Sequence, residues 1–152
     1  MHDVEFNAEL TITKVVLNNQ QIKEFNLHIR DITQQIKLQR KMTKLAYHDP
    51  LTDLYNRSYF IKRLQQEIDY SSRHETTLTL MFLDLDQFKS INDNLGHKAG
   101  DNVLQIVATR LNQEITEGDV ICRWGGDEFI MLFPELSKQS EVIQKAGDIL
   151  KN

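Results

Sequence analysis

Apolar and polar residues alternate in two short stretches near the start of the chain, with the period of a half-buried strand. In the first stretch the apolar positions are Val4, Phe6, Ala8, Leu10 and Ile12. In the second they are Phe25, Leu27 and Ile29. The residues Asn18-Asn19-Gln20 between them are typical of a turn, so the pattern predicts an antiparallel hairpin. A hairpin of two strands is only marginally stable in water by itself.

The period changes after the second stretch, and a helix is predicted from about Thr33 to Tyr47. Asp31 or Thr33 can begin it, because both side chains cap helices well. Its apolar positions have i, i+4, i+7 spacing: Leu38, Met42 and Leu45. Such a short seam fits a coiled-coil linker that pairs two copies of the chain, and it also fits a plain amphipathic helix packed on its own domain. Two heptads do not decide between these readings.

Three further helices follow from the helical period and from capping residues. Asn56 can cap a helix whose apolar face is Phe60, Ile61, Leu64 and Ile68. The outward face of that helix is expected to be solvated: Lys62, Arg63, Gln66 and Glu67. A helix after Asp101 is expected to bury Val103, Leu104, Val107 and Leu111. Ser140 can cap a last helix with the apolar face Val142, Ala146, Ile149 and Leu150.

Three strands are predicted among these helices. The nearly continuous apolar run Thr77–Leu83 suits a strand buried on both faces in the middle of a sheet. Val120–Cys122 and Phe129–Phe133 read as two more strands, joined by a tight turn at Gly125-Gly126. The order of strand, helices, hairpin and helix predicts an α+β fold with helices on the faces of a sheet.

Acidic residues stand at the ends of two of these strands. Asp84 ends the Thr77–Leu83 run, and Asp127 and Glu128 follow the glycine pair. If the hairpin lies beside the first strand, the three carboxylates converge, and they then need a cation. Oxygen donors without Cys or His suit Mg²⁺ or Mn²⁺ rather than Zn²⁺. The chemistry indicated is phosphoryl or nucleotidyl transfer; the alternative is an ordinary hairpin with a polar tip.

The segment after Asp84 fits a nucleotide. A helix is expected to begin at Gly100 and Asp101, where a helix N-terminus would attract an anion. Asn92 and Asp101 could read a purine edge, and Lys89 could meet a phosphate. Each has an ordinary alternative: Asn92 as a turn residue, Asp101 as a helix cap, Lys89 as a solvated charge, and His97 as a loop histidine.

Together these residues resemble the GGDEF domain of diguanylate cyclases over residues 45–152. The matching motifs, in family order, are His48–Arg57, Asp84–Lys89, Ile91–Asp93, Gly96-His97, Gly100-Asp101 and Gly125–Phe129. The resemblance implies a palm-like nucleotidyl-cyclase fold. It implies an enzyme that joins two GTP molecules into cyclic di-GMP and releases pyrophosphate. Each domain of a homodimer would hold one GTP.

The resemblance also implies roles for individual residues. The implied metal ligands are Asp84, the Leu85 carbonyl, Asp127 and Glu128, with Asp127 also the proton acceptor for the ribose 3′-hydroxyl. The implied substrate contacts are Asn92 and Asp101 at guanine, His97 at a further position, and Lys89 with the Gly125-Gly126 backbone near phosphates. Metal ions would neutralise the triphosphate and lower the hydroxyl pKa.

This sequence departs from the family in two places. The family's inhibitory motif, Arg-x-x-Asp, is degenerate because Thr116 replaces its arginine, while Asp119 remains. Thr cannot grip phosphate or guanine as a guanidinium does, so we expect no strong product inhibition. Members of the family also continue for several dozen residues beyond Asn152. Without that part, the Thr77–Leu83 strand would become an edge and activity would be impaired.

The beginning of the chain, with Arg30-Asp31-Ile32-Thr33, resembles the C-terminal end of a PAS sensory domain. The implied organisation is a PAS-derived part at 1–33, a signalling linker helix at 34–47 and a partial GGDEF domain at 45–152. His2 and His28 are expected to be surface residues rather than haem ligands.

Composition narrows these readings further. The net charge of −4 gives no basic footprint for nucleic acid. Cys122 is the only cysteine, so an internal disulfide is impossible, which fits a cytoplasmic location. No apolar run is long enough to span a membrane. A diguanylate cyclase unit is therefore the leading hypothesis. The alternatives are a non-catalytic module that binds GTP or a partner protein, and a fragment of a longer protein.

Overall fold

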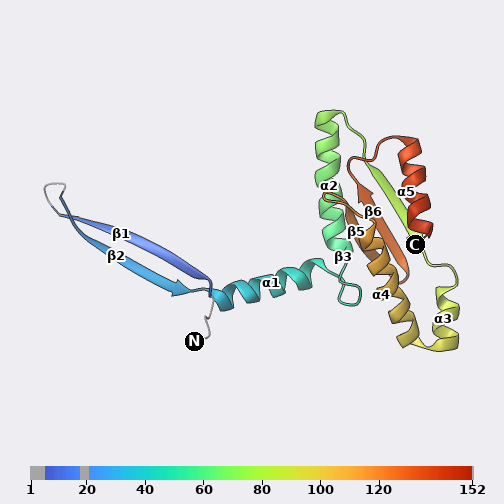
Figure 1. The fold of residues 1–152 in the computed structure, drawn as a ribbon, viewed down its shortest axis with the longest axis horizontal. Helices are drawn as coiled ribbons and strands as arrows, with labels where there is room; N and C mark the ends of the chain where they lie inside the picture. The colour runs from blue at the N-terminus through green and yellow to red at the C-terminus, as the bar shows by residue number, and fades with distance from the viewer. Residues whose placement is uncertain (1–5, 18–20, 152) are drawn as a thin grey trace. The chain divides into compact units, whose positions relative to one another are not determined.

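The computed structural model of the chain describes residues 6–17 and 21–151, and at 15–17 and 21–24 it describes the backbone alone. The chain divides into two compact units, Met1–Lys44 and Leu45–Asn152. Figure 1 shows the elements of each unit.

The first unit is built on an antiparallel hairpin of β1 (Ala8–Leu17) and β2 (Gln21–Asp31), as the alternating pattern predicts. Leu10 lies opposite Ile29, and Ile12 lies opposite Leu27. These four side chains share one face, and each is more than half exposed. His28 is exposed, as predicted. Val4, His2 and the expected turn at Asn18–Gln20 lie outside the described residues.

Helix α1 (Thr33–Tyr47) follows the hairpin, with the bounds that the sequence predicts. Oδ1 of Asp31 accepts a hydrogen bond from the Thr33 amide at 2.8 Å, so Asp31 satisfies the start of the helix. The seam residues Leu38, Met42 and Leu45 are all exposed. Pairing of two copies through this seam stays a prediction.

The second unit has a four-stranded sheet with the order β3-β5-β6-β4. Its strands are β3 (Tyr55–Asn56), β4 (Thr79–Asp84), β5 (Val120–Gly125) and β6 (Glu128–Phe133). Its helices are α2 (Arg57–His74), α3 (Phe88–Leu95), α4 (His97–Gln113) and α5 (Gln139–Lys151). Strand β3 is parallel to β5, and the other pairs are antiparallel. This is the α+β layout expected from the sequence.

The two faces of the sheet have separate cores. On one face Phe60 of α2 packs with alternate residues of β5 and β6, namely Val120, Cys122, Ile130 and Leu132. On the other face α4 and α5 pack against the intervening residues, namely Ile121, Phe129, Met131 and Phe133. Figure 1 shows α2 on one side of the sheet and α4 and α5 on the other. Strand β6 is therefore buried on both faces, and Cys122 is buried as predicted.

The Thr77–Leu83 run is not a central strand buried on both faces, whereas the expectation that it forms an edge in this chain is confirmed for the described sheet. Strand β4 lies at the edge of the described sheet, and β6 is its one strand neighbour there. Helix α2 packs on β5, so the residues of β4 on that face are uncovered, and Phe82 is 75% exposed. The strand buried on both faces is β6.

The capping prediction for α2 is confirmed, since Oδ1 of Asn56 accepts a bond from the Tyr59 amide at 3.1 Å. The predicted faces are partly wrong. Ile61 and Ile68 are exposed, whereas Glu67, expected to be solvated, is buried in an ion pair with Arg63. A carboxylate can be buried here because its partner lies one helical turn away.

Two other helix boundaries differ from expectation. Helix α5 begins at Gln139, so Ser140 lies inside it rather than at its cap, and Leu150 is 80% exposed. Helix α4 begins at His97, after Gly96 with φ +81°, and not at Gly100. Asp101 therefore lies beyond the first turn and is not a helix cap. The predicted contacts of Leu104 and Leu111 with the core are confirmed.

Candidate active site

The glycine pair forms the tip of the β5–β6 hairpin. Gly125 is paired with Glu128, and the turn itself is Gly126-Asp127. Gly126 has φ +55°, a left-handed conformation that a glycine adopts at little cost. The register shifts between Arg123 and Gly125, so the strand carries an irregularity just before the turn.

The register of the sheet places Asp84 beside this tip. Asp84 is the direct cross-strand partner of Glu128 in the β4–β6 pair. Asp127 precedes Glu128 in the turn and is half-buried, while Asp84 and Glu128 are exposed. The described residues contain no group of three or more His, Cys, Asp or Glu side chains gathered closely enough to hold a metal ion. The expected juxtaposition of Asp84 and Glu128 is therefore present, and the convergence of all three carboxylates stays a prediction.

The donor chemistry around Asp84 suits a hard cation. Two carboxylates and a backbone carbonyl are all-oxygen donors, and Mg²⁺ often takes only one or two carboxylates. The Leu85 carbonyl accepts a hydrogen bond from the Phe88 amide at 3.2 Å, which leaves its second lone pair free. A shallow pocket of about 170 Å³ lies between β4 and the hairpin and includes Asp84, Trp124 and Glu128 in its lining.

Helices α3 and α4 bring Asn92 and Gly100 into contact. A Cβ atom built on Gly100 would overlap Oδ1 of Asn92 and would lie 3.2 Å from Cζ of Phe88. Any side chain at position 100 would force Asn92 to move, so the position of the Asn92 amide depends on this glycine. Asp101 follows Gly100 on α4 and is exposed, as are His97 and Lys89.

Arg123 and Asp49 were not among the predicted site residues, yet they hold the hairpin tip. Nε and Nη2 of Arg123 donate to the Gly126 carbonyl at 3.0 and 2.8 Å. Nη1 of the same guanidinium donates to Asp49 at 3.2 and 3.3 Å. The opposite charges of Asp49 in the His48–Arg57 motif and of Arg123 just before Gly125 could have indicated this contact, but sequence spacing alone does not connect the two segments.

The Asp49 carboxylate is fixed on several sides. Burial would by itself raise its pKa, but hydrogen bonds from the Thr52 hydroxyl and amide, and then Arg123, outweigh burial and lower the pKa. Asp49 is therefore ionised at neutral pH and is a firm partner for the guanidinium.

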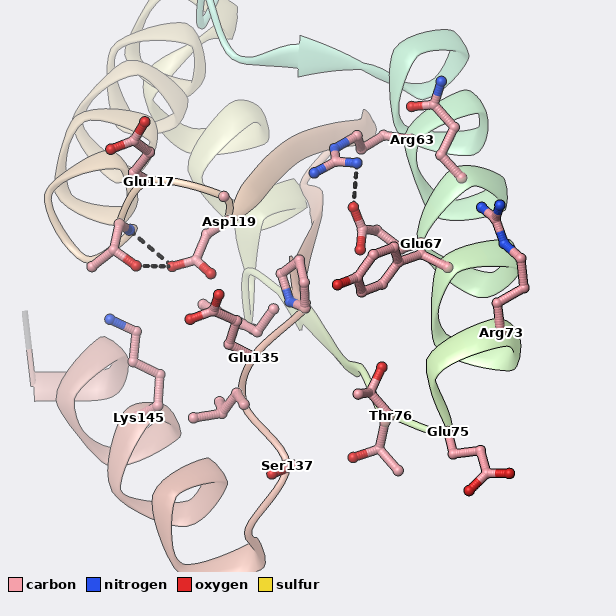
Figure 2. A pocket seen from close by; sticks show the side chains of 18 residues that line it. Arg63, Glu67, Arg73, Glu75, Thr76, Glu117, Asp119, Glu135, Ser137 and Lys145 are labelled. Atoms are coloured by element: carbon pink, nitrogen blue, oxygen red, sulfur yellow. Dashed lines mark hydrogen bonds and ion pairs between the residues drawn. The ribbon is translucent and has the colours of Figure 1, made fainter.

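The position expected for a degenerate inhibitory motif lies at the opposite end of the strands. Asp119 lines a cavity of about 1020 Å³. Figure 2 shows the Arg63–Glu67 pair on α2 across from it. Oδ2 of Asp119 accepts bonds from the Thr116 amide and hydroxyl, both at 2.8 Å. The aspartate thus closes its own turn, and Thr116 offers no guanidinium.

Comparison with known protein families matches residues 46–152 to "Diguanylate cyclase, GGDEF domain". The chain belongs to the GGDEF family. The family's fold agrees with the α+β architecture described above.

Individual GGDEF proteins support this assignment. The chain is 38% identical over 132 residues to diguanylate cyclase TpbB of Pseudomonas aeruginosa, covering 84% of this chain and 30% of that protein. It resembles the solved GGDEF domain of TpbB at 40% identity and a TM-score of 0.66, with 69% and 61% coverage. It resembles DgcB of Caulobacter crescentus, solved with cyclic di-GMP, at 30% identity and a TM-score of 0.73, with 78% and 61% coverage.

The chain spans about a third or less of the length of curated relatives such as TpbB, of which it covers 30%. Among its described residues, no helix has both the length and the apolar character needed to cross a bilayer.

Proposed function

We propose that this chain carries one half-site of a diguanylate cyclase, in which two GTP molecules are condensed into cyclic di-GMP with release of pyrophosphate. Membership of the GGDEF family and the named activity of relatives such as TpbB support this proposal. The observation that carries it is the cross-strand pairing of Asp84 with Glu128 beside the Gly126-Asp127 turn. This pairing puts acidic groups from two separate motifs at one edge of the unit.

The proposed metal ligands are Asp84, the Leu85 carbonyl, Asp127 and Glu128, and the proposed ion is Mg²⁺ or Mn²⁺. Such an ion would neutralise triphosphate charge and lower the pKa of the ribose 3′-hydroxyl. In this proposal Asp127 accepts the hydroxyl proton. Its position in the turn, next to Glu128, supports this role, because a side chain there can face a bound substrate while the backbone keeps the hairpin conformation.

The proposed GTP contacts lie on both sides of these carboxylates. Asn92 and Asp101 would bind the guanine edge, and the contact of Asn92 with the bare Gly100 backbone supports a fixed position for the amide. His97 would make a further substrate contact. Lys89 and the backbone N–H groups of Gly125 and Gly126 would bind phosphates.

Catalysis would need two copies, because each copy contributes one GTP. We propose that the GGDEF units and the exposed α1 seam form the homodimer, in the cytoplasm, and that the hairpin before α1 derives from a PAS domain. We further propose that the chain by itself turns over GTP less well than longer relatives, since the uncovered edge strand β4 carries Asp84.

The direct test is to incubate the chain with GTP and Mg²⁺ and to measure cyclic di-GMP and pyrophosphate. We expect product from the wild type and a loss of about 100-fold or more in Asp84→Asn and Asp127→Asn, as for removal of groups that act on transition-state charge. Asp148→Asn on α5 is the matched control, because it removes a carboxylate far along the chain from these motifs. Equal rates in all four proteins would contradict the proposal.

The second candidate is a non-catalytic module that binds GTP. It would use the same contact of Asn92 with Gly100, which positions the amide without a metal ion. Calorimetric GTP binding that weakens in Asn92→Ala, with no product formed even at high protein concentration, would support this module over the cyclase.

A further inference from the structure

Arg123 joins two segments that are far apart in the sequence. Nη1 of its guanidinium donates to Asp49, in the loop that follows α1, and Nε and Nη2 donate to the Gly126 carbonyl in the turn. Its side chain is 15% exposed and that of Asp49 is 18% exposed. The guanidinium is thus shielded and fixed, unlike a surface charge that samples many conformations.

The bond to Gly126 fixes more than one atom. The carbonyl of Gly126 and the amide N–H of Asp127 belong to the same peptide, and the chain contains no cis peptide among its described residues. In a trans peptide these two groups point in opposite directions. Because Arg123 binds the carbonyl, the Asp127 N–H is directed away from the guanidinium.

Asp49 is itself anchored to its loop. Its Oδ1 accepts hydrogen bonds from the amides of Leu51 and Thr52 at 3.2 and 2.8 Å, and from the Thr52 hydroxyl at 2.8 Å. The same loop begins where α1 ends, at Tyr47. The Arg123 guanidinium therefore links this loop directly to the turn.

We propose that Arg123 is a positioning residue that sets the Gly126–Asp127 peptide relative to the loop after α1. This inference rests on the proposed function for its kinetic consequence and on geometry for its structural one. Arg123 touches neither GTP nor a metal in this proposal. It orients the Asp127 N–H and carboxylate for the step after substrate has bound, so its loss lowers kcat and leaves KM for GTP nearly unchanged.

The variant that tests this role is Arg123→Lys, which keeps the charge but cannot bind Gly126 and Asp49 together. We expect kcat to fall about 10- to 100-fold while KM changes less than about twofold. Asp49→Asn keeps the acceptor for Thr52 and removes the charge, and we expect the same direction with a smaller effect. Lys138→Gln, which breaks the exposed Lys138–Glu141 pair at 2.8 Å, is the matched control and should change neither constant.

A second readout does not need turnover. In nitrogen-15 NMR spectra of the full chain, the Gly126 and Asp127 amide signals should shift in Arg123→Lys and in Asp49→Asn, and the Asp127 amide should exchange faster with solvent. Lys138→Gln should leave both signals in place. Thermal unfolding of each variant identifies any protein that has simply lost its fold, and Asp49→Asn then carries the test.

The outcomes are distinguishable. Unchanged Gly126 and Asp127 signals in both variants would overturn the inference, whatever the rates. Shifted signals with unchanged kcat, or a raised KM at constant kcat, would also overturn it, because the turn would then not be positioned for the chemical step. If the wild type forms no product, the proposed function fails, while the amide signals still decide whether Arg123 sets the turn.

Discussion

Gly100 shows how one missing side chain can make room for a neighbouring one. It lies inside α4, where glycine costs stability relative to alanine. It does not need its conformational freedom there, because its φ is not positive. What it provides is space for Asn92, whose Oδ1 occupies the place of a Cβ atom.

Gly100→Ala should therefore lose the benefit that alanine normally brings to a helix. We expect a helix gain of about 0.5–1 kcal/mol to be outweighed by about 1–3 kcal/mol of overpacking, together with weaker GTP binding as Asn92 is displaced. Gly147→Ala in α5 is the matched control, since its new Cβ would meet no atom within 4 Å. Urea unfolding should show Gly147→Ala stabilised and Gly100→Ala destabilised. Equal stabilisation of both would contradict the contact.

Asp49 should make the fold sensitive to acid. Its pKa in the folded state is lowered from 3.8, mainly by the Thr52 bonds and Arg123 acting against burial. The folded state then binds fewer protons than the unfolded state, so the stabilisation is present above pH 3.8 and is lost as the pH falls through the folded value. We expect Asp49→Asn to cost about 1–2 kcal/mol at pH 7 and progressively less below pH 3.8, as measured by urea unfolding. A constant difference at every pH would contradict this linkage.

At the scale of single residues, the acidic residues could be predicted from the sequence, but the hydrogen bonds that fix the hairpin turn could not. Asp84 and Glu128 could be predicted as neighbours because Asp84 follows one apolar run and Glu128 precedes another, and the two runs suit adjacent strands. The bonds of Arg123 to Asp49 and Gly126 could not, because they depend on a side chain crossing between segments 74 residues apart.

At the scale of the elements, the side chain of Asn56 links the end of α1 to the start of α2. The single amide of Asn56 serves both helices: Oδ1 accepts from the Tyr59 amide at the start of α2, and Nδ2 donates to the Ala46 carbonyl in the last turn of α1 at 2.9 Å. One residue therefore satisfies an N-terminal donor and a C-terminal acceptor.

Substitutions at Asn56 should separate these two roles. Asn56→Ala loses both bonds, and we expect it to cost about 1–2 kcal/mol. Asn56→Ser keeps a capping oxygen but cannot donate to Ala46, so its cost should be about half as large. Urea unfolding gives both values, and hydrogen exchange at the end of α1 should rise equally in both variants. If hydrogen exchange at the end of α1 rose in Asn56→Ala but not in Asn56→Ser, the bond to the Ala46 carbonyl would be contradicted.

The helices and the hairpin were predicted well because local sequence patterns determine them. The burial of each strand was predicted less well because it depends on the strand's place in the sheet. The period of 3.6 found α1 and α2, and the Gly-Gly turn found the β5–β6 hairpin. The runs of β4 and β6 are both continuously apolar, so composition could not show that β6 is covered on two faces and β4 on one. Glu67 was misplaced for a related reason, because its burial depends on Arg63 and not on its own polarity.

At the scale of the whole molecule, two units with different stabilisation are joined by α1. The Leu45–Asn152 unit has a core on each face of its sheet, whereas the described hairpin of the Met1–Lys44 unit leaves its apolar face exposed. The exposed seam of Leu38, Met42 and Leu45 lies on the connecting helix. If two GTP half-sites must meet, this seam is the part of the chain that can raise their effective concentration.

The rate per chain should therefore rise with protein concentration and level off when dimers dominate, because a lone half-site holds one GTP. Met42→Glu places a charge in the seam and should shift this rise to higher concentration by about tenfold or more, the effect of 1.4 kcal/mol on association. Thr43→Glu adds the same charge on the opposite side of α1 and should leave the curve nearly unchanged. Sedimentation measured at the same concentrations links the rate to the dimer. A rate per chain that stays constant where sedimentation detects only monomers would show that the two half-sites need not meet.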